Sequence, residues 1–136
     1  MAEIIAQEGV RLSTALVAMG AAANVTVLVH TQSPGKRAVI KKIIWHNRTG
    51  APGVLRFGFL TLGAVFTQVL PDIFMVAGLD GQLNENDLPI CGNTPQGFAA
   101  DTTAVTGTLG AIQAQSSVAG VAPADVQVRI EVEEIG

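Results

Sequence analysis

The segment near the end of the chain, positions 126–133, alternates apolar and polar residues without interruption. Valine or isoleucine stands at each even position, and glutamine, arginine or glutamate at each odd one. Successive side chains of a β-strand point to opposite faces, so this period of two predicts a strand with one buried and one solvated face. Strands of this kind are typical of antiparallel sheets. We therefore expect Val126–Ile135 to be a core strand of a small β-sandwich or barrel.

Earlier segments show shorter strand patterns separated by turn residues. We expect strands near positions 9–17, 25–30, 37–47, 55–62, 65–70, 73–76 and 106–116, and a long turn-rich connection at 80–97. With the closing strand this makes about eight strands and no helix, which favours an all-β fold. The expected architecture is a single antiparallel β-sandwich with a jelly-roll or related Greek-key topology. An immunoglobulin-like sandwich is the alternative, although the chain lacks the disulfide of that fold.

The segment Arg37–Asn47 has no clear solvent face, because its odd and even positions both combine large apolar residues with a lysine. One interpretation is a strand covered on both faces, the second cover being a loop or a neighbouring subunit. The other is a β-bulge at Lys41–Lys42, which shifts the alternation so that Ile40 and Ile43 enter the same core. Trp45, the only tryptophan, is either a core anchor or an interface hot spot.

The composition points to a surface that is partly covered. The chain has 136 residues, of which 49% are hydrophobic and only 14% charged, whereas a globular protein has about 25% charged residues. We expect residues 1–136 to form one β-sandwich domain. With so few charges, part of its surface is expected to be buried against another copy or a partner.

The charges are unevenly spread along the chain. The net charge of −3 argues against a dedicated nucleic-acid binder, yet most of the basic residues lie between positions 36 and 56. They form either a solvated face or one side of a head-to-tail contact between subunits. The residues that we expect at such an interface are Ile44, Trp45, Lys41, Lys42, Arg48 and Arg56.

The sequence offers little chemistry. A single cysteine, Cys91, cannot form an intramolecular disulfide. His30 and His46 fall on different expected strands, and the oxygen-rich segment 80–87 is explained by turn formation. No nucleophile or phosphate-binding motif occurs in the sequence. We therefore expect a protein that is not an enzyme, with no catalytic residue, no metal and no cofactor.

The aromatic residues are also placed in the core by their strand positions. The chain has no tyrosine, and a sugar-binding sandwich presents exposed aromatic platforms. The phenylalanines expected in the core are Phe57, Phe59, Phe66 and Phe74.

The turn-rich segment Leu83–Pro89 and the closing strand Val126–Ile135 resemble parts of the small jelly-roll proteins that build or decorate viral and phage capsids. The resemblance is one of pattern over the whole chain and transfers no functional residue. It implies a structural protein that forms a homo-oligomer, with a trimer as the expected form, as a decoration or shell subunit. A larger protein shell is the other partner it implies, and a nucleic acid is not expected.

The expected location follows from the same resemblance and from the apolar runs. Glu3 stands where a signal peptide needs positive charge, and the longest apolar run, 15–23, is shorter than the roughly 20 residues that span a bilayer. We expect no signal peptide or transmembrane segment, and a location in the virion or, before assembly, in the cytoplasm. The alternative functions are a receptor-binding fibre tip and a cupin-like binder, the latter with its site at His30 and His46.

Overall fold

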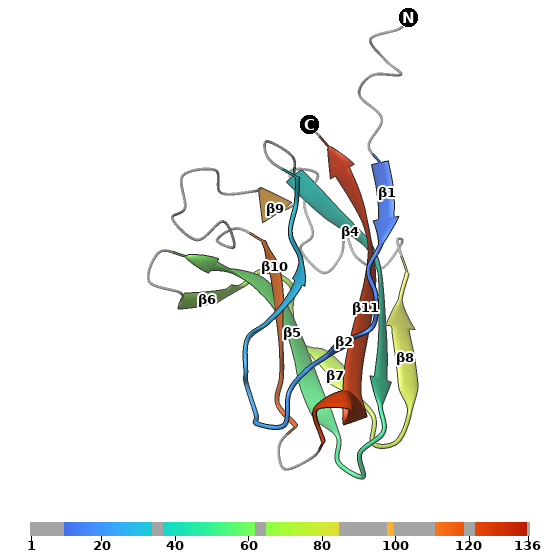
Figure 1. Ribbon diagram of the computed structural model, residues 1–136. Helices are drawn as coiled ribbons and strands as arrows, with labels where there is room; N and C mark the ends of the chain where they lie inside the picture. The colour runs from blue at the N-terminus through green and yellow to red at the C-terminus, as the bar shows by residue number, and fades with distance from the viewer. Residues whose placement is uncertain are drawn as a thin grey trace, which may run out of the picture.

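The computed structural model describes residues 10–33, 37–61, 65–84, 98–99, 111–118 and 122–135. Within these residues the chain forms two antiparallel β-sheets that pack face to face (Figure 1). The helical content of this part is one 3-10 turn, η1 (Pro123–Asp125), just before the last strand. The expected all-β sandwich is confirmed.

The first sheet, called here the β11 sheet, has the strand order β1-β11-β4-β8. These strands are β1 (Val10–Ser13), β11 (Val126–Ile135), β4 (Arg37–Asn47) and β8 (Asp80–Leu83). Two strands of two residues extend it, β2 (Val17–Ala18) beside β11 and β9 (Phe98–Ala99) beside β4.

The second sheet, called here the β5 sheet, has the strand order β3-β10-β5-β6. Its strands are β3 (Val27–His30), β10 (Ile112–Ser116), β5 (Gly53–Thr61) and β6 (Val65–Gln68). The short strand β7 (Ile73–Met75) also pairs with β5, beyond the end of β6.

The strand order identifies the topology as a jelly roll. In chain order the first main strand pairs with the last (β1 with β11), the second with the one before it (β3 with β10), and so on inward to β4 with β8 and β5 with β6. An antiparallel ribbon of this kind, wrapped into two sheets, is the jelly roll, which consists of two Greek keys. The described residues contain eleven strands. The three strands beyond the expected eight are β2, β8 and β9, of two, four and two residues. The expectation that the connection of 80–97 begins at position 80 is therefore wrong, because Asp80–Leu83 pairs with β4.

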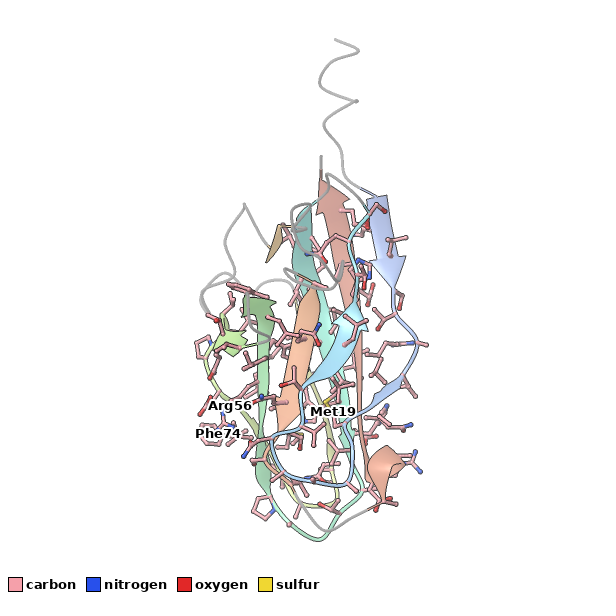
Figure 2. The ribbon with its side chains drawn as sticks, turned by 60° about the vertical axis from the view of Figure 1, so that its left-hand side comes forward. Met19, Arg56 and Phe74 are labelled. Atoms are coloured by element: carbon pink, nitrogen blue, oxygen red, sulfur yellow. The ribbon has the colours of Figure 1, made fainter. Side chains whose placement is uncertain are left out.

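The closing strand is buried as its alternation predicts. The side chains of Val126, Val128, Ile130 and Val132 are 0–1% exposed. They face the interior between the two sheets, where Leu55 and Phe57 of β5 and Ile112 and Ala114 of β10 are fully buried. Met19, just after β2, also lies between the sheets (Figure 2). One core therefore joins the first, middle and last parts of the chain.

Strand β4 contains the bulge. Lys42 pairs with Glu131 and Ile40 with Val132, so the register shifts and Lys41 is the extra residue. As a result Ile40 and Ile43 are both buried, at 1% and 0% exposure. The bulge interpretation is confirmed. At the start of the strand Ala38, Val39 and Ile40 are all buried, so both faces are covered there.

Candidate functional site

The two sheets present outer faces of very different charge. The strands of the β11 sheet contain nine acidic or basic residues, namely Arg11, Arg37, Lys41, Lys42, Asp80, Arg129, Glu131, Glu133 and Glu134. The strands of the β5 sheet contain one, Arg56. The charged strand residues therefore lie mainly in the β11 sheet, where the Glu134 side chain is buried and the exposed ones lie on the outer face.

On the outer face of the β11 sheet basic and acidic residues of neighbouring strands lie side by side. Lys41 Nζ lies 3.3 Å from the Glu133 carboxylate, and His46 Nδ1 lies 2.8 Å from Asp80 Oδ1. Lys42 stands directly across from Glu131 in the β4–β11 pair. Basic and acidic segments that are far apart in the sequence thus meet as cross-strand neighbours, an arrangement that suits contact with water.

The outer face of the β5 sheet carries an exposed apolar patch around β7. Ile73 and Met75 are buried, whereas Phe74 between them is 77% exposed. Val76 and Leu79, in the turn that follows, are 59% and 58% exposed. We call Phe74, Val76 and Leu79 the β7 patch. In Figure 2 Phe74 and Arg56 project from the same outer side of the sheet, away from Met19 in the interior.

A buried polar network fixes the backbone of the β7 patch. The Asn47 side chain is 1% exposed, and its Nδ2 donates to the carbonyls of Ala51 and Val76, at 2.9 and 3.2 Å. Its Oδ1 accepts from the backbone N–H and the hydroxyl of Thr49, at 3.1 and 2.6 Å. The Asn47 N–H also donates to the Leu79 carbonyl. The turn that carries Val76 and Leu79 is therefore anchored to the end of β4.

An ordered ion pair lies beside Phe74. Arg56 Nε donates to Asp72 Oδ1 at 3.2 Å, and Nη1 donates to Asn24 Oδ1 at 3.1 Å. Gln68 Nε2 donates to the same Asp72 oxygen at 2.7 Å. Because Val54 pairs with Phe74, Arg56 lies one step along the same outer face. One positive and one negative group thus flank the exposed ring.

The six residues expected at an interface do not form one surface. Lys41, Lys42 and Ile44 belong to β4 in the β11 sheet, and Arg56 belongs to β5 in the other sheet. Arg48 is exposed at the turn after β4, where its N–H donates to the Asp125 carbonyl. Trp45 is 7% exposed and belongs to the core cluster.

The expectation that Phe74 lies in the core is wrong, because this residue is 77% exposed. The strand β7 alternates with Ile73 and Met75 inward, so the residue between them must face outward. The alternation in Ile73–Val76 indicates that Phe74 points outward, but a strand of three residues is too short for this alternation to be recognised from the sequence. The β7 patch was missed for the same reason.

A second cluster lies between the sheets at the end of β11. Glu134 is 7% exposed, and its carboxylate accepts from the Ser33 N–H at 3.1 Å and from the Ser33 hydroxyl at 3.5 Å. His30 Nε2 lies 3.6 Å from the same carboxylate. Burial, the largest influence, raises the pKa of Glu134, but the Ser33 hydrogen bonds and His30 lower it, and the pKa ends below its usual 4.5.

This cluster does not form a nucleophile site, because the carboxylate lies between the hydroxyl and the imidazole. An activated serine needs its hydroxyl on the histidine, with the acid behind the histidine. The arrangement instead ties the segment after β3 to the end of β11. Its partners are 101 positions apart in the chain, so no local sequence motif indicated it.

The structure does not bring the two histidines together. His30 faces the interior from β3 and contacts Glu134, whereas His46 contacts Asp80 on the outer face of the β11 sheet. Over the described ranges, no three His, Cys, Asp or Glu side chains are grouped to hold a metal ion. The described residues also include no helix of the length and hydropathy needed to cross a membrane. Cys91 and most of the oxygen-rich segment lie outside the described residues.

No family model and no curated protein matches the chain. Among solved structures it is similar to the cyanophage Pam1 capsid asymmetric unit, at 15% identity and a TM-score of 0.39, over 94% of this chain and 86% of that one. It is also similar to infectious bursal disease virus, Gx strain, at 11% identity and a TM-score of 0.27, over 95% of this chain and 38% of that one. A structure of the T13 particle of the same virus gives 11% identity and a TM-score of 0.24, with 96% and 38% covered. These neighbours are viral capsid structures. The strand order of this chain is known from the pairing of its own strands.

Proposed function

We propose that the chain is a non-enzymatic structural protein that assembles with copies of itself. The observation that carries the proposal is the outer face of the β5 sheet, where Phe74 is 77% exposed and the strands contain one charged residue, Arg56. Large apolar side chains that gather on a folded surface mark a site of contact with another protein. The charged outer face of the β11 sheet remains in water.

The proposed setting is a virion, where the chain acts as a capsid-associated decoration or shell subunit. Two observations support this setting. The sequence pattern resembles that of small capsid proteins, and the strand order is the jelly roll, a fold that viral capsid subunits use. The proposed form is a homo-oligomer such as a trimer, attached to a larger protein shell.

The test is the native mass in solution, measured by light scattering over a range of protein and salt concentrations. An oligomer or a closed particle that persists at high salt supports the proposal, because apolar contacts are not screened as exposed ion pairs are. Electron microscopy of the same sample then shows whether the assembly is a shell. A monomer at every concentration contradicts self-assembly and favours a receptor-binding module that needs a different partner.

A further inference from the structure

We propose that the β7 patch binds the same patch of a second copy across a two-fold axis, with Arg56 of each copy facing Asp72 of the other. This inference rests on the proposed self-assembly. A two-fold contact pairs two copies, so in a shell it would join neighbouring oligomers such as trimers and would not hold one trimer together. In such an isologous interface both copies use the same residues, so the patch must complement itself.

Exposure identifies Phe74 as the centre of the contact. Its ring is 77% exposed, the highest value among the exposed large apolar side chains of the described residues. An aromatic ring contributes a large apolar area and often dominates the energetics of an interface. Val76 and Leu79, in the turn that follows β7, are also exposed and add apolar surface to the patch. Two copies of this patch bury each other's rings, which water otherwise surrounds.

Charge complementarity favours a second copy as the occupant. The patch is flanked by one cation and one anion, Arg56 and Asp72, held 3.2 Å apart. A two-fold rotation brings the cation of one copy toward the anion of the other, so both groups find an opposite charge. A strongly acidic or strongly basic partner would satisfy one of the two and repel the other. The strands of the β5 sheet carry no further acidic or basic residue that would oppose the approach of two copies.

The patch is also held in its binding conformation before contact. The Val76 and Leu79 backbone is bonded to Asn47, and the Arg56–Asp72 pair is bonded to Asn24 and Gln68. Groups that are already ordered lose little conformational freedom on association, so more of the interaction energy appears as affinity.

The first test replaces the ring with a charge, Phe74→Asp. The two-fold contact should weaken at least about 30-fold, as expected for a residue at the centre of an interface, and the scattering mass should fall at concentrations where the wild type is associated. Because the side chain faces water, the melting temperature of the dissociated subunit should stay near that of the wild type. Leu16→Asp is the matched control, since Leu16 is 47% exposed at another site, and it should leave the mass unchanged.

The second test exchanges the charges. Arg56→Asp alone and Asp72→Arg alone each place like charges opposite one another across the two-fold axis, so each variant should associate poorly with itself. In a one-to-one mixture, position 56 of the first variant meets position 72 of the second with opposite sign, at both ends of the contact. The mixture should therefore associate as the wild type does. Mixing cannot restore the ion pair within each subunit, so a rescue reports the contact between subunits. A mixture that stays dissociated overturns the proposal.

The outcomes separate this inference from the proposed function. A wild type that associates, with a Phe74→Asp variant of equal mass, shows that assembly uses another surface; the two-fold contact is then wrong and self-assembly stands. A wild type that stays monomeric overturns both. Loss of association in Phe74→Asp together with rescue in the charge-exchange mixture supports both.

Discussion

The indole ring of Trp45 occupies the space that a side chain at Gly81 would fill. The two residues are directly opposite each other in the β4–β8 pair. A methyl group built on Gly81 would overlap the six-membered ring and lie only 2.7 Å from Nε1. The Trp45 side chain therefore lies over Gly81 of the neighbouring strand, where a larger residue does not fit. The indole ring covers the core at the β8 edge of the sheet.

Gly81→Ala should destabilise the protein by about 1 to 3 kcal/mol, as overpacking of a filled core usually does. The change forces either the indole or strand β8 to move. Urea unfolding followed by Trp45 fluorescence measures the loss. Gly50→Ala is the matched control, because no atom lies within 4 Å of the added methyl group, and its free energy of unfolding should change by less than about 0.5 kcal/mol.

A smaller ring at position 45 should relieve the clash. Trp45→Phe combined with Gly81→Ala is expected to cost less than the sum of the two single changes, since residues in contact are not additive. Additive losses would show that the ring and the glycine do not share the space assigned to them.

Asn47→Ala should destabilise the fold by about 1 to 3 kcal/mol, because it removes hydrogen bonds from several backbone groups and leaves the Thr49 N–H without its buried acceptor. The affected groups include the carbonyls of Ala51 and Val76 and the N–H of Thr49. Since the same bonds hold the turn with Val76 and Leu79, association through the β7 patch should weaken as well. Chemical denaturation gives the first effect and light scattering of the folded variant gives the second. If the variant is less stable but associates as strongly as the wild type, the Asn47 hydrogen bonds are not needed for the contact through the β7 patch.

The strands that the sequence predicted best are those whose pattern is long and local. Within Val126–Ile135 the alternation runs over the eight residues 126–133, and the burial of these residues follows it. The bulge in β4 was also visible, because two adjacent lysines interrupt the apolar rows on both faces. In each case the information lies within one strand, where side-chain direction depends only on the period of two.

The features that the sequence did not predict depend on residues far apart in the chain. Strand order needs pairings such as β1 with β11, which no local pattern encodes. The contact of Ser33 with Glu134 is of the same kind. Phe74 was misplaced for a different reason, since a large apolar residue in a strand is normally buried. Its exposure is a departure from the general rule, and it agrees with the proposed contact of Phe74 with a second copy.

Stability should fall in acid partly through Glu134. Its pKa is below the usual 4.5 in the folded protein, so the folded state holds the carboxylate charged more readily than the unfolded chain does. The resulting stabilisation is present above pH 4.5 and is lost as the pH falls through the lowered folded value. Urea midpoints measured from pH 7 down to about pH 3 should show this loss in the wild type.

Glu134→Gln tests that assignment. The variant should be less stable than the wild type at pH 7 by about 1 to 3 kcal/mol, and the difference should shrink in acid, where the wild-type carboxyl is also neutral. Ser33→Ala should keep most of the pH dependence, because the backbone N–H of Ser33 still donates to the carboxylate. If the stability of Glu134→Gln and that of the wild type fall in parallel as the pH is lowered, the loss of stability in acid comes from other groups.

The bulge in β4 makes a single-residue deletion informative. Without Lys41, one residue separates Ile40 from Ile43, which restores a regular period of two with both side chains inward. The expected loss is about 0 to 1 kcal/mol from the ion pair with Glu133, and the near-ultraviolet circular dichroism of Trp45 should be retained. Deletion of Ile44 is the control, because it makes Ile43 and Trp45 adjacent and sends one of them to the solvent face. That variant should lose the native near-ultraviolet signal, whereas loss of the signal on deletion of Lys41 would show that the bulge itself is required for the sheet to pair.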